Sequence, residues 1–285
     1  MEDKIIALHD DYRSGHTGRR DFLKRLALLT GSTATALTLL PVLENNTLSA
    51  AEKCEKLKKV MAEAMTYPAE PMEMKGYLAH PVRGKKFPAV VVIQEIFGLN
   101  EHIRDVTRRM AGEGFLALAP DALSPLGGTP EDTTGARGMM GQLDPVQTTK
   151  NFVAAVKYLK THPLSNGKVG CTGFCWGGAM TNQVAVNCPS LDAAVPYYGS
   201  QPKTEEVPKI KAPLLIHYAE NDQRINAGIE AFEEALKENG KEFQSFIYPG
   251  TGHGFNNDSA PERYNEEAAK LAWSRTVAFF KEKLK

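Results

Sequence analysis

The segment Val169-Gly-Cys-Thr-Gly-Phe-Cys-Trp-Gly-Gly178 decides the fold class of this 285-residue chain. Its first part, 169–174, is a short apolar run that predicts a buried strand, and 177–186 predicts a helix directly after it. Between them lies Gly173-Phe-Cys-Trp-Gly177, a G-x-C-x-G pattern. A nucleophile on such a strained turn needs glycine two residues before and after it, because side chains there would collide with the neighbouring strand and helix. The pattern predicts a nucleophile elbow at Cys175; the alternative is a structural cysteine beside a tight turn.

The thiol of Cys175 would face the first turn of the predicted helix. Free backbone N–H groups and the positive end of the helix dipole favour an anion at that place, so we expect them to stabilise a thiolate. Cys171 lies four residues earlier, inside the predicted strand, and is interpreted as a core residue.

A cysteine nucleophile needs a base, and the base needs a group that orients it. His253 lies in Tyr248-Pro-Gly-Thr-Gly-His-Gly-Phe255, after a predicted strand, and Asp222 follows the strand before that one. Active sites of open α/β sheets gather at the carboxyl ends of strands. The chain order nucleophile, acid, histidine is that of the α/β-hydrolases. We therefore predict a triad of Cys175, Asp222 and His253, and interpret His217, inside a strand, as a core residue.

Strands and helices are predicted to alternate from residue 71 onward. The predicted strands are 74–79, 89–93, 115–119, 169–174, 193–198, 213–219 and 243–248, and the predicted helices are 100–113, 145–161, 177–186, 225–239 and 261–283. Residues 121–143, rich in Gly, Pro and Thr, predict a long loop. The alternation predicts an α/β-hydrolase fold, with a mostly parallel central sheet and helices on both faces.

The first fifty residues are predicted to be a separate segment. Arg19-Arg20 precedes Phe-Leu-Lys, an uncharged segment over 26–43 and small residues at 49–51. This order resembles a twin-arginine export signal, which implies the export machinery as a partner and a periplasmic location. The alternatives are a basic amphipathic helix with a linker, and a cytoplasmic enzyme. Residues 51–70 are predicted as a helical linker, with its helix at Ala51–Met65, and 71–285 as the hydrolase domain.

Composition excludes several classes of protein. The chain has 34 Lys and Arg against 34 Asp and Glu, so it lacks the positive charge of a nucleic-acid binder. Four cysteines are too few for a disulfide scaffold. Because the sequence contains neither a cluster with zinc-ligand spacing nor a phosphate-binding glycine loop, no metal or other cofactor is expected.

Four segments together resemble the dienelactone hydrolases (carboxymethylenebutenolidases). They are Gln94-Glu-Ile-Phe-Gly98, Gly173-Phe-Cys-Trp-Gly-Gly178, Asn221-Asp222 and Gly252-His-Gly-Phe255, and the resemblance extends over about residues 68–284. It implies hydrolysis of a small lactone or carboxylic ester through an acyl-cysteine intermediate.

The resemblance also implies roles for six residues. The triad is Cys175, Asp222 and His253; Glu95 controls formation of the thiolate; and the backbone N–H groups of Ile96 and Trp176 form the oxyanion hole.

The sequence departs from the family where the substrate carboxylate is bound. Asn257 stands four residues after His253, where dienelactone-active members have arginine, and no arginine lies in the loop at 124–127. The natural substrate is therefore left open. One alternative is an acyl hydrolase acting on a lipid, a glycan or a thioester. Another is a non-catalytic binding or redox-sensing protein in which Cys175 is oxidised.

Overall fold

A computed structural model describes residues 21–22, 24–26, 59–132 and 134–285. The chain divides into two units, Met1–Lys53 and Cys54–Lys285. In the first unit, residues 21, 22 and 24–26 have helical backbone. The export signal predicted at 1–50 lies almost wholly outside the described residues, as do residues 51–58 of the predicted linker.

The described part of the second unit contains one eight-stranded sheet in the order β1-β2-β4-β3-β5-β6-β7-β8. β1 and β2 pair antiparallel, as do β2 and β4, and every later neighbour is parallel. The strands are β1 (Val60–Ala69), β2 (Met72–Pro81), β3 (Phe87–Ile93), β4 (Leu116–Pro120), β5 (Ser165–Phe174), β6 (Ala193–Tyr197), β7 (Leu214–Asn221) and β8 (Phe243–Gly252). The carboxyl ends of β3, β5, β7 and β8 therefore meet at one edge.

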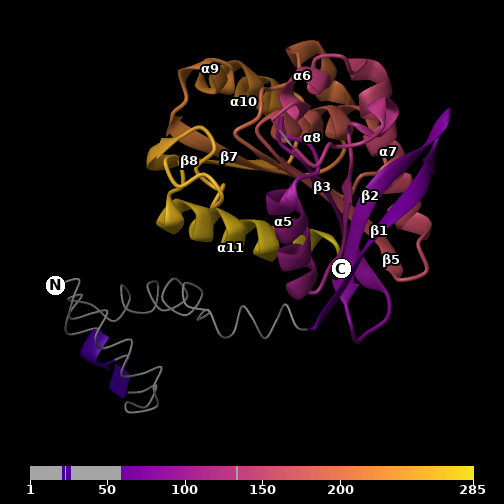
Figure 1. Cartoon of the computed structure of the whole chain (residues 1–285). Coiled ribbons are helices and arrows are strands. Elements are labelled where there is room, and N and C mark those ends of the chain that lie inside the picture. Colours follow the sequence, from indigo (N-terminus) through magenta and orange to yellow (C-terminus); the bar gives the residue numbers. More distant parts are fainter. Residues whose placement is uncertain (1–20, 23, 27–58, 133) are drawn as a thin grey trace. The chain divides into compact units, whose positions relative to one another are not determined.

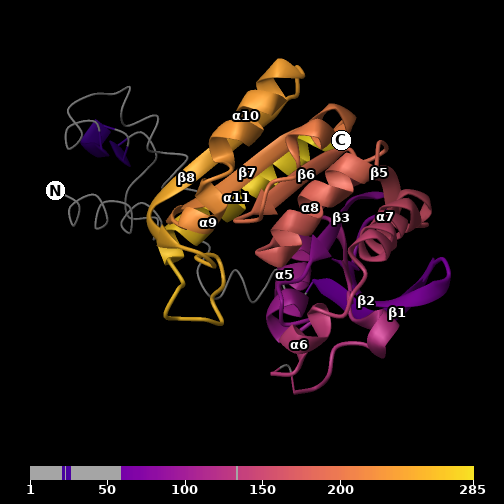
Figure 2. The ribbon, with the colours of Figure 1, turned by 90° about the horizontal axis from the view of Figure 1, so that it is seen from above.

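Helices cover both faces of this sheet (Figures 1 and 2). They are α5 (Glu101–Gly112), α6 (Ala136–Met140), α7 (Pro145–Thr161), α8 (Trp176–Asn187), α9 (Gln223–Asn226), α10 (Ile229–Glu238) and α11 (Glu266–Lys283), with 3-10 turns η1 (Ser124–Leu126) and η2 (Thr204–Lys209). Two apolar clusters form the core: one joins the sheet to α7, α8 and α10, the other to α5 and α11. The predicted fold class is confirmed.

The predicted helical linker is wrong over 60–69, where the chain forms β1. Ala, Met and Glu favour a helix in isolation. Here the segment pairs with β2 from Val60↔Pro81 to Ala69↔Met72, and the Tyr67 ring is buried while its hydroxyl donates to the carbonyl of Asn151 (3.1 Å). These tertiary interactions outweigh the intrinsic helix preference.

The helix predicted over 225–239 is divided in two. α9 ends at Asn226 and α10 begins at Ile229, with Gly228 between them. α9 thus begins directly after Asp222, the residue that follows β7, and is separate from the longer α10.

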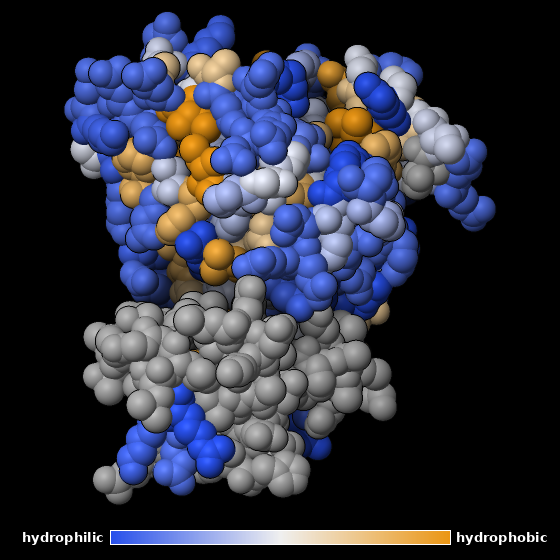
Figure 3. Space-filling view, turned by 90° about the vertical axis from the view of Figure 1, so that its left-hand side faces the viewer, coloured by the Kyte–Doolittle hydropathy of each residue, from blue (hydrophilic) through white to orange (hydrophobic). Residues whose placement is uncertain are grey.

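The face on the side of β8 is mainly hydrophilic, with small separate apolar patches (Figure 3). Ile247 on this edge strand is 54% exposed. None of the helices in the described parts of the chain has the length and apolar character that crossing a bilayer requires.

His217 on β7 belongs to a fully hydrogen-bonded network in the core. Thr276 Oγ1 donates to the Ala272 carbonyl (2.9 Å), so it must accept from His217 Nε2 (3.0 Å). The Tyr248 hydroxyl accepts from Arg275 Nη1 (3.1 Å) and donates to His217 Nδ1 (2.9 Å). These bonds fix the neutral Nε2–H tautomer. Burial, together with the Arg275 charge, lowers the pKa of His217 to about 3.

We expect His217 to make the protein sensitive to acid. The unfolded chain protonates this imidazole near its ordinary pKa of 6.5, whereas the folded chain leaves it neutral down to about 3. The contribution of His217 to the unfolding free energy is therefore fully present above about pH 6.5. Below that pH it falls by about 1.4 kcal/mol for each pH unit. Glutamine cannot take the proton, so the gap in unfolding free energy between wild type and His217→Gln should narrow by about 2–3 kcal/mol between about pH 7 and 4.5. Urea unfolding checks this; a pH-independent gap would contradict it.

Candidate active site

Cys175 lies on a strained turn between β5 and α8. Its backbone dihedrals are φ 58° and ψ −116°, in a region that residues other than glycine rarely adopt. A Cβ placed on Gly173 would lie 2.3 Å from the carbonyl oxygen of Gly177, and one on Gly177 would lie 2.4 Å from that of Gln94. The two glycines thus allow the turn and bring the end of β3 against the start of α8.

The environment of the Cys175 thiol favours its protonated form. Burial raises the pKa of the thiol, and the charge of Glu95 raises it further. The Trp176 backbone N–H donates to the sulfur, and this bond and the charges of Arg224 and Arg263 lower the pKa of the thiol. Their combined effect is smaller than that of burial and Glu95. The start of the helix therefore favours a thiolate as expected, but in the resting site burial and Glu95 outweigh this effect and the thiol is protonated.

Asp222 and His253 are directly hydrogen-bonded. Asp222 Oδ2 lies 2.5 Å from His253 Nδ1, and the aspartate is 7% exposed. Asn221 pairs with Gly252 after a bulge in the β7–β8 ladder, so the loops that carry Asp222 and His253 lie side by side. Because Nδ1 is held by the carboxylate, Nε2 is the nitrogen left to exchange a proton.

Glu95 and Ile96 follow β3 in the loop that approaches α8. Glu95 is 4% exposed and accepts a hydrogen bond from Asn257 Nδ2 at 2.6 Å. Ile96 is half-buried, and among the described residues its backbone N–H donates to no other group. The close approach at Gly177 places this loop beside the N–H of Trp176.

Tyr198 connects these groups. Its ring lies 5.1 Å from that of His253 in an edge-on contact, and its backbone φ is 35°. Burial raises the pKa of the Tyr198 hydroxyl, and the charges of Glu95 and Cys175 raise it further. Cys175, Glu95 and His253 thus all lie near Tyr198, although within the described structure no hydrogen bond joins the thiol to His253 or Glu95.

The sequence analysis did not identify Tyr198, Arg224 and Arg263 as neighbours of the Cys175 thiol, because no motif marks these residues. Asn257 stands where dienelactone-active members have an arginine that binds the substrate carboxylate. In this structure Asn257 is 3% exposed and its side chain donates a hydrogen bond to Glu95. Its spacing from His253 was a signal that the position matters, although not of which group it contacts.

No cluster of three or more His, Cys, Asp or Glu side chains in the described ranges could hold a metal ion. Cys171 and Cys188 are buried free thiols. Burial raises the pKa of Cys171 to about 12, so its thiol is a poor nucleophile.

Known proteins share both the sequence and the fold. A sequence model of the dienelactone hydrolase family matches residues 74–284. A candidate carboxymethylenebutenolidase from Synechocystis sp. is 35% identical over 78% of this chain and 96% of its own length. One from Methylorubrum extorquens is 32% identical over 91% of this chain and 93% of its own length.

The chain belongs to the dienelactone hydrolase family. The crystal structure of a candidate dienelactone hydrolase from Klebsiella pneumoniae matches with a TM-score of 0.72 and 31% identity, covering 78% of this chain and 99% of the other. Family membership makes this protein a hydrolase of the lactone and carboxylic-ester class.

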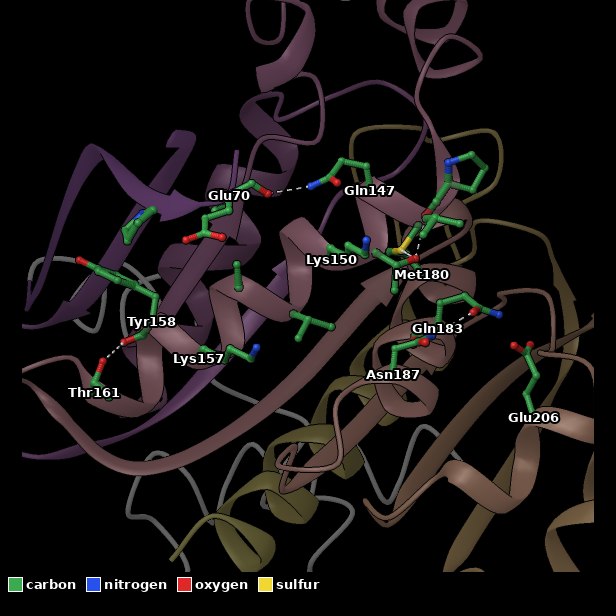
Figure 4. Close-up of a pocket in the computed structure, with 17 residues that line it drawn as sticks. Glu70, Gln147, Lys150, Lys157, Tyr158, Thr161, Met180, Gln183, Asn187 and Glu206 are labelled. Carbon is green, nitrogen blue, oxygen red and sulfur yellow. Dashed lines mark hydrogen bonds between the residues drawn. The ribbon is translucent and has the colours of Figure 1, made fainter. Parts of the chain in front are cut away.

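A large groove of about 1170 Å³ lies elsewhere on this family member (Figure 4). It is lined by α7, by Met180, Gln183 and Asn187 of α8, by the β1–β2 turn and by Glu206. None of the six candidate residues lines it. The groove is therefore a separate surface and not the mouth of the site at Cys175.

Proposed function

We propose that this protein hydrolyses a lactone or ester through a triad of Cys175, His253 and Asp222 and an acyl-cysteine intermediate. The observation that carries this is the Asp222–His253 hydrogen bond at the sheet edge where Cys175 occupies the strained turn. The names of the relatives point to an enol-lactone substrate, carboxymethylenebutenolide, and we propose a substrate of this class.

In the first half of the reaction, His253 Nε2 takes the proton of the Cys175 thiol, and the sulfur attacks the ester carbonyl. Asp222 favours this step because it stabilises the imidazolium that forms. The oxyanion is held by the N–H groups of Ile96 and Trp176, the second of which donates to the sulfur in the resting site. When the C–O bond breaks, His253 returns the proton to the leaving oxygen, which in a lactone stays attached to the acyl chain.

In the second half, a water molecule gives a proton to His253 and its oxygen attacks the thioester carbonyl. The C–S bond breaks, the carboxylic acid leaves, and the proton returns to the sulfur. Glu95 has a resting role: its negative charge keeps the thiol protonated, which protects the sulfur from oxidation between turnovers.

An acyl-trapping experiment tests the mechanism. Wild type mixed with p-nitrophenyl acetate and quenched in acid within the first turnover should carry one acetyl group on the peptide that contains Cys175. Mass spectrometry detects it, and Cys188→Ala, which removes a buried thiol, should label equally. Steady turnover with no acetyl group at Cys175 would overturn the proposal.

We propose that the protein is exported by the twin-arginine route. Arg19-Arg20 and the uncharged segment over 26–43 support this. An oxidising compartment suits the site, because the two neighbouring cysteines are buried and the resting nucleophile is a thiol.

Replacing Arg19 and Arg20 by lysine should trap the protein in the cytoplasm, because the export machinery reads the arginine pair and not its charge. Cell fractionation followed by blotting measures this, with a cytoplasmic marker enzyme as the control. If the wild-type chain, with Met1 still attached, is found wholly in the cytoplasm, export is excluded.

A further inference from the structure

The Glu95 carboxylate has an unusual set of neighbours for a buried charge. It is 4% exposed, and no Lys, Arg or His among the described residues forms an ion pair with it. Its hydrogen-bond donor in the described structure is the amide of Asn257, at 2.6 Å and a separation of 162 positions. A buried carboxylate stays ionised only when donors replace its lost hydration, so this amide bears directly on the charge state of Glu95.

The orientation of the Asn257 amide is fixed by its other end. Asn257 Oδ1 accepts hydrogen bonds from the backbone N–H of Ser259 (3.0 Å) and from its hydroxyl (2.6 Å). The oxygen is thereby turned toward Ser259 and the NH₂ group toward Glu95. A flipped amide would lose the bond to Glu95 and the bond from the Ser259 backbone N–H, and it would place two oxygens in contact.

The next residue fixes the position of this loop on the helix that follows Glu95. Asp258 lies 3.1 Å from His102 Nδ1 and 3.2 Å from Arg109 Nη1, both on α5. The loop that carries His253 and Asn257 is therefore attached at two adjacent points to the segment that carries Glu95. This sets the distance between the amide and the carboxylate.

We propose that Asn257 is a positioning residue that holds Glu95 as an ionised carboxylate beside Cys175 without adding a positive charge to the site. This inference rests on the proposed function, in which Cys175 is the nucleophile. An arginine at this position would satisfy the carboxylate and also cancel its charge. A neutral amide satisfies it and leaves the full charge acting on the thiol.

Other charged groups also face the thiol. Arg263 approaches from the loop after β8, Arg224 from α9 and Tyr198 from the end of β6, and the His253 ring packs against Tyr198. Arg224 and Arg263 are exposed, so solvent and salt screen their effect. Glu95 and its amide donor are buried, so their effect on the thiol is screened least.

The inference makes a signed prediction about thiol reactivity. Without the amide, the buried Glu95 carboxylate loses the hydrogen-bond donor that supports its charge, and the state with a Cys175 thiolate becomes more populated. The loss of one hydrogen bond to a charged group corresponds to about a tenfold shift in that population. Asn257→Leu should therefore be alkylated at Cys175 by iodoacetamide about tenfold faster than wild type near pH 7.

Three variants of the full chain separate this role from a merely structural one. Glu95→Gln should accelerate alkylation at least as much as Asn257→Leu, and the double variant should react no faster than Glu95→Gln alone. Glu220→Gln removes an exposed charge without touching Glu95, Asn257 or the Asp258 contacts with α5, so it should alkylate at the wild-type rate. If Asn257→Leu does not fold, Asn257→Ser, which lacks the reach to Glu95, takes its place with the same expectation.

Three results would overturn the inference: wild-type alkylation in folded Asn257→Leu, further acceleration by Asn257→Leu when Glu95 is already Gln, or equal acceleration by Glu220→Gln. The alkylation assay needs no substrate, so it is independent of hydrolysis. If Cys175→Ala still hydrolyses esters, the proposed function fails. If only the alkylation pattern fails, the role of Asn257 is wrong and the triad stands.

Discussion

Replacing Cys175 by alanine is expected to lower kcat/KM for p-nitrophenyl acetate by about four to six orders of magnitude, while the protein stays folded. Alanine removes the sulfur that forms the acyl intermediate, and no other described thiol can replace it, since Cys171 and Cys188 are buried. Ester hydrolysis followed by absorbance, with circular dichroism to verify folding, measures the loss.

The matched control is Cys188→Ala, which removes a cysteine that is 2% exposed and far along α8 from the turn. It should keep wild-type turnover. Hydrolysis by Cys175→Ala within tenfold of wild type would leave a different nucleophile, or a directly activated water, as the source of activity.

Asp222→Asn should lower kcat by about two to four orders of magnitude and leave KM almost unchanged. The carboxylate accepts from His253 Nδ1 and stabilises the imidazolium in the transition state. Asparagine offers an amide of the same shape, but it carries no charge and can turn its NH₂ toward the ring, which selects the wrong tautomer. Steady-state kinetics and thermal unfolding of the same preparation separate catalysis from stability.

Glu220→Gln is the control for this variant. Glu220 lies two residues earlier, is exposed, and accepts a hydrogen bond from the backbone N–H of Gly250 at 2.8 Å. Glutamine keeps an oxygen that can accept this bond and removes only an exposed charge, so turnover should change less than about twofold. If Asp222→Asn were fully active, or Glu220→Gln as impaired as Asp222→Asn, another carboxylate would orient His253.

The sequence by itself determined the features that depend on short stretches of chain. Glycines at 173 and 177 predicted the turn at Cys175, because the collisions they prevent involve atoms a few residues away or directly across the turn. Alternating strands and helices predicted the sheet, and residues at the ends of successive parallel strands meet at one edge whatever the details of packing. That is why Asp222 and His253 could be paired from spacing and order.

Only the tertiary structure decided the features that depend on through-space contact. The segment 60–69 has residues that favour a helix, yet it forms β1 because ten residues of β2 are available to pair with it. The resting state of Cys175 also differs from its local sequence context: the helix start favours a thiolate, but burial and Glu95 favour the thiol. The Asn257–Glu95 bond joins positions 162 apart, and such a contact depends on how two loops pack, which no local pattern encodes.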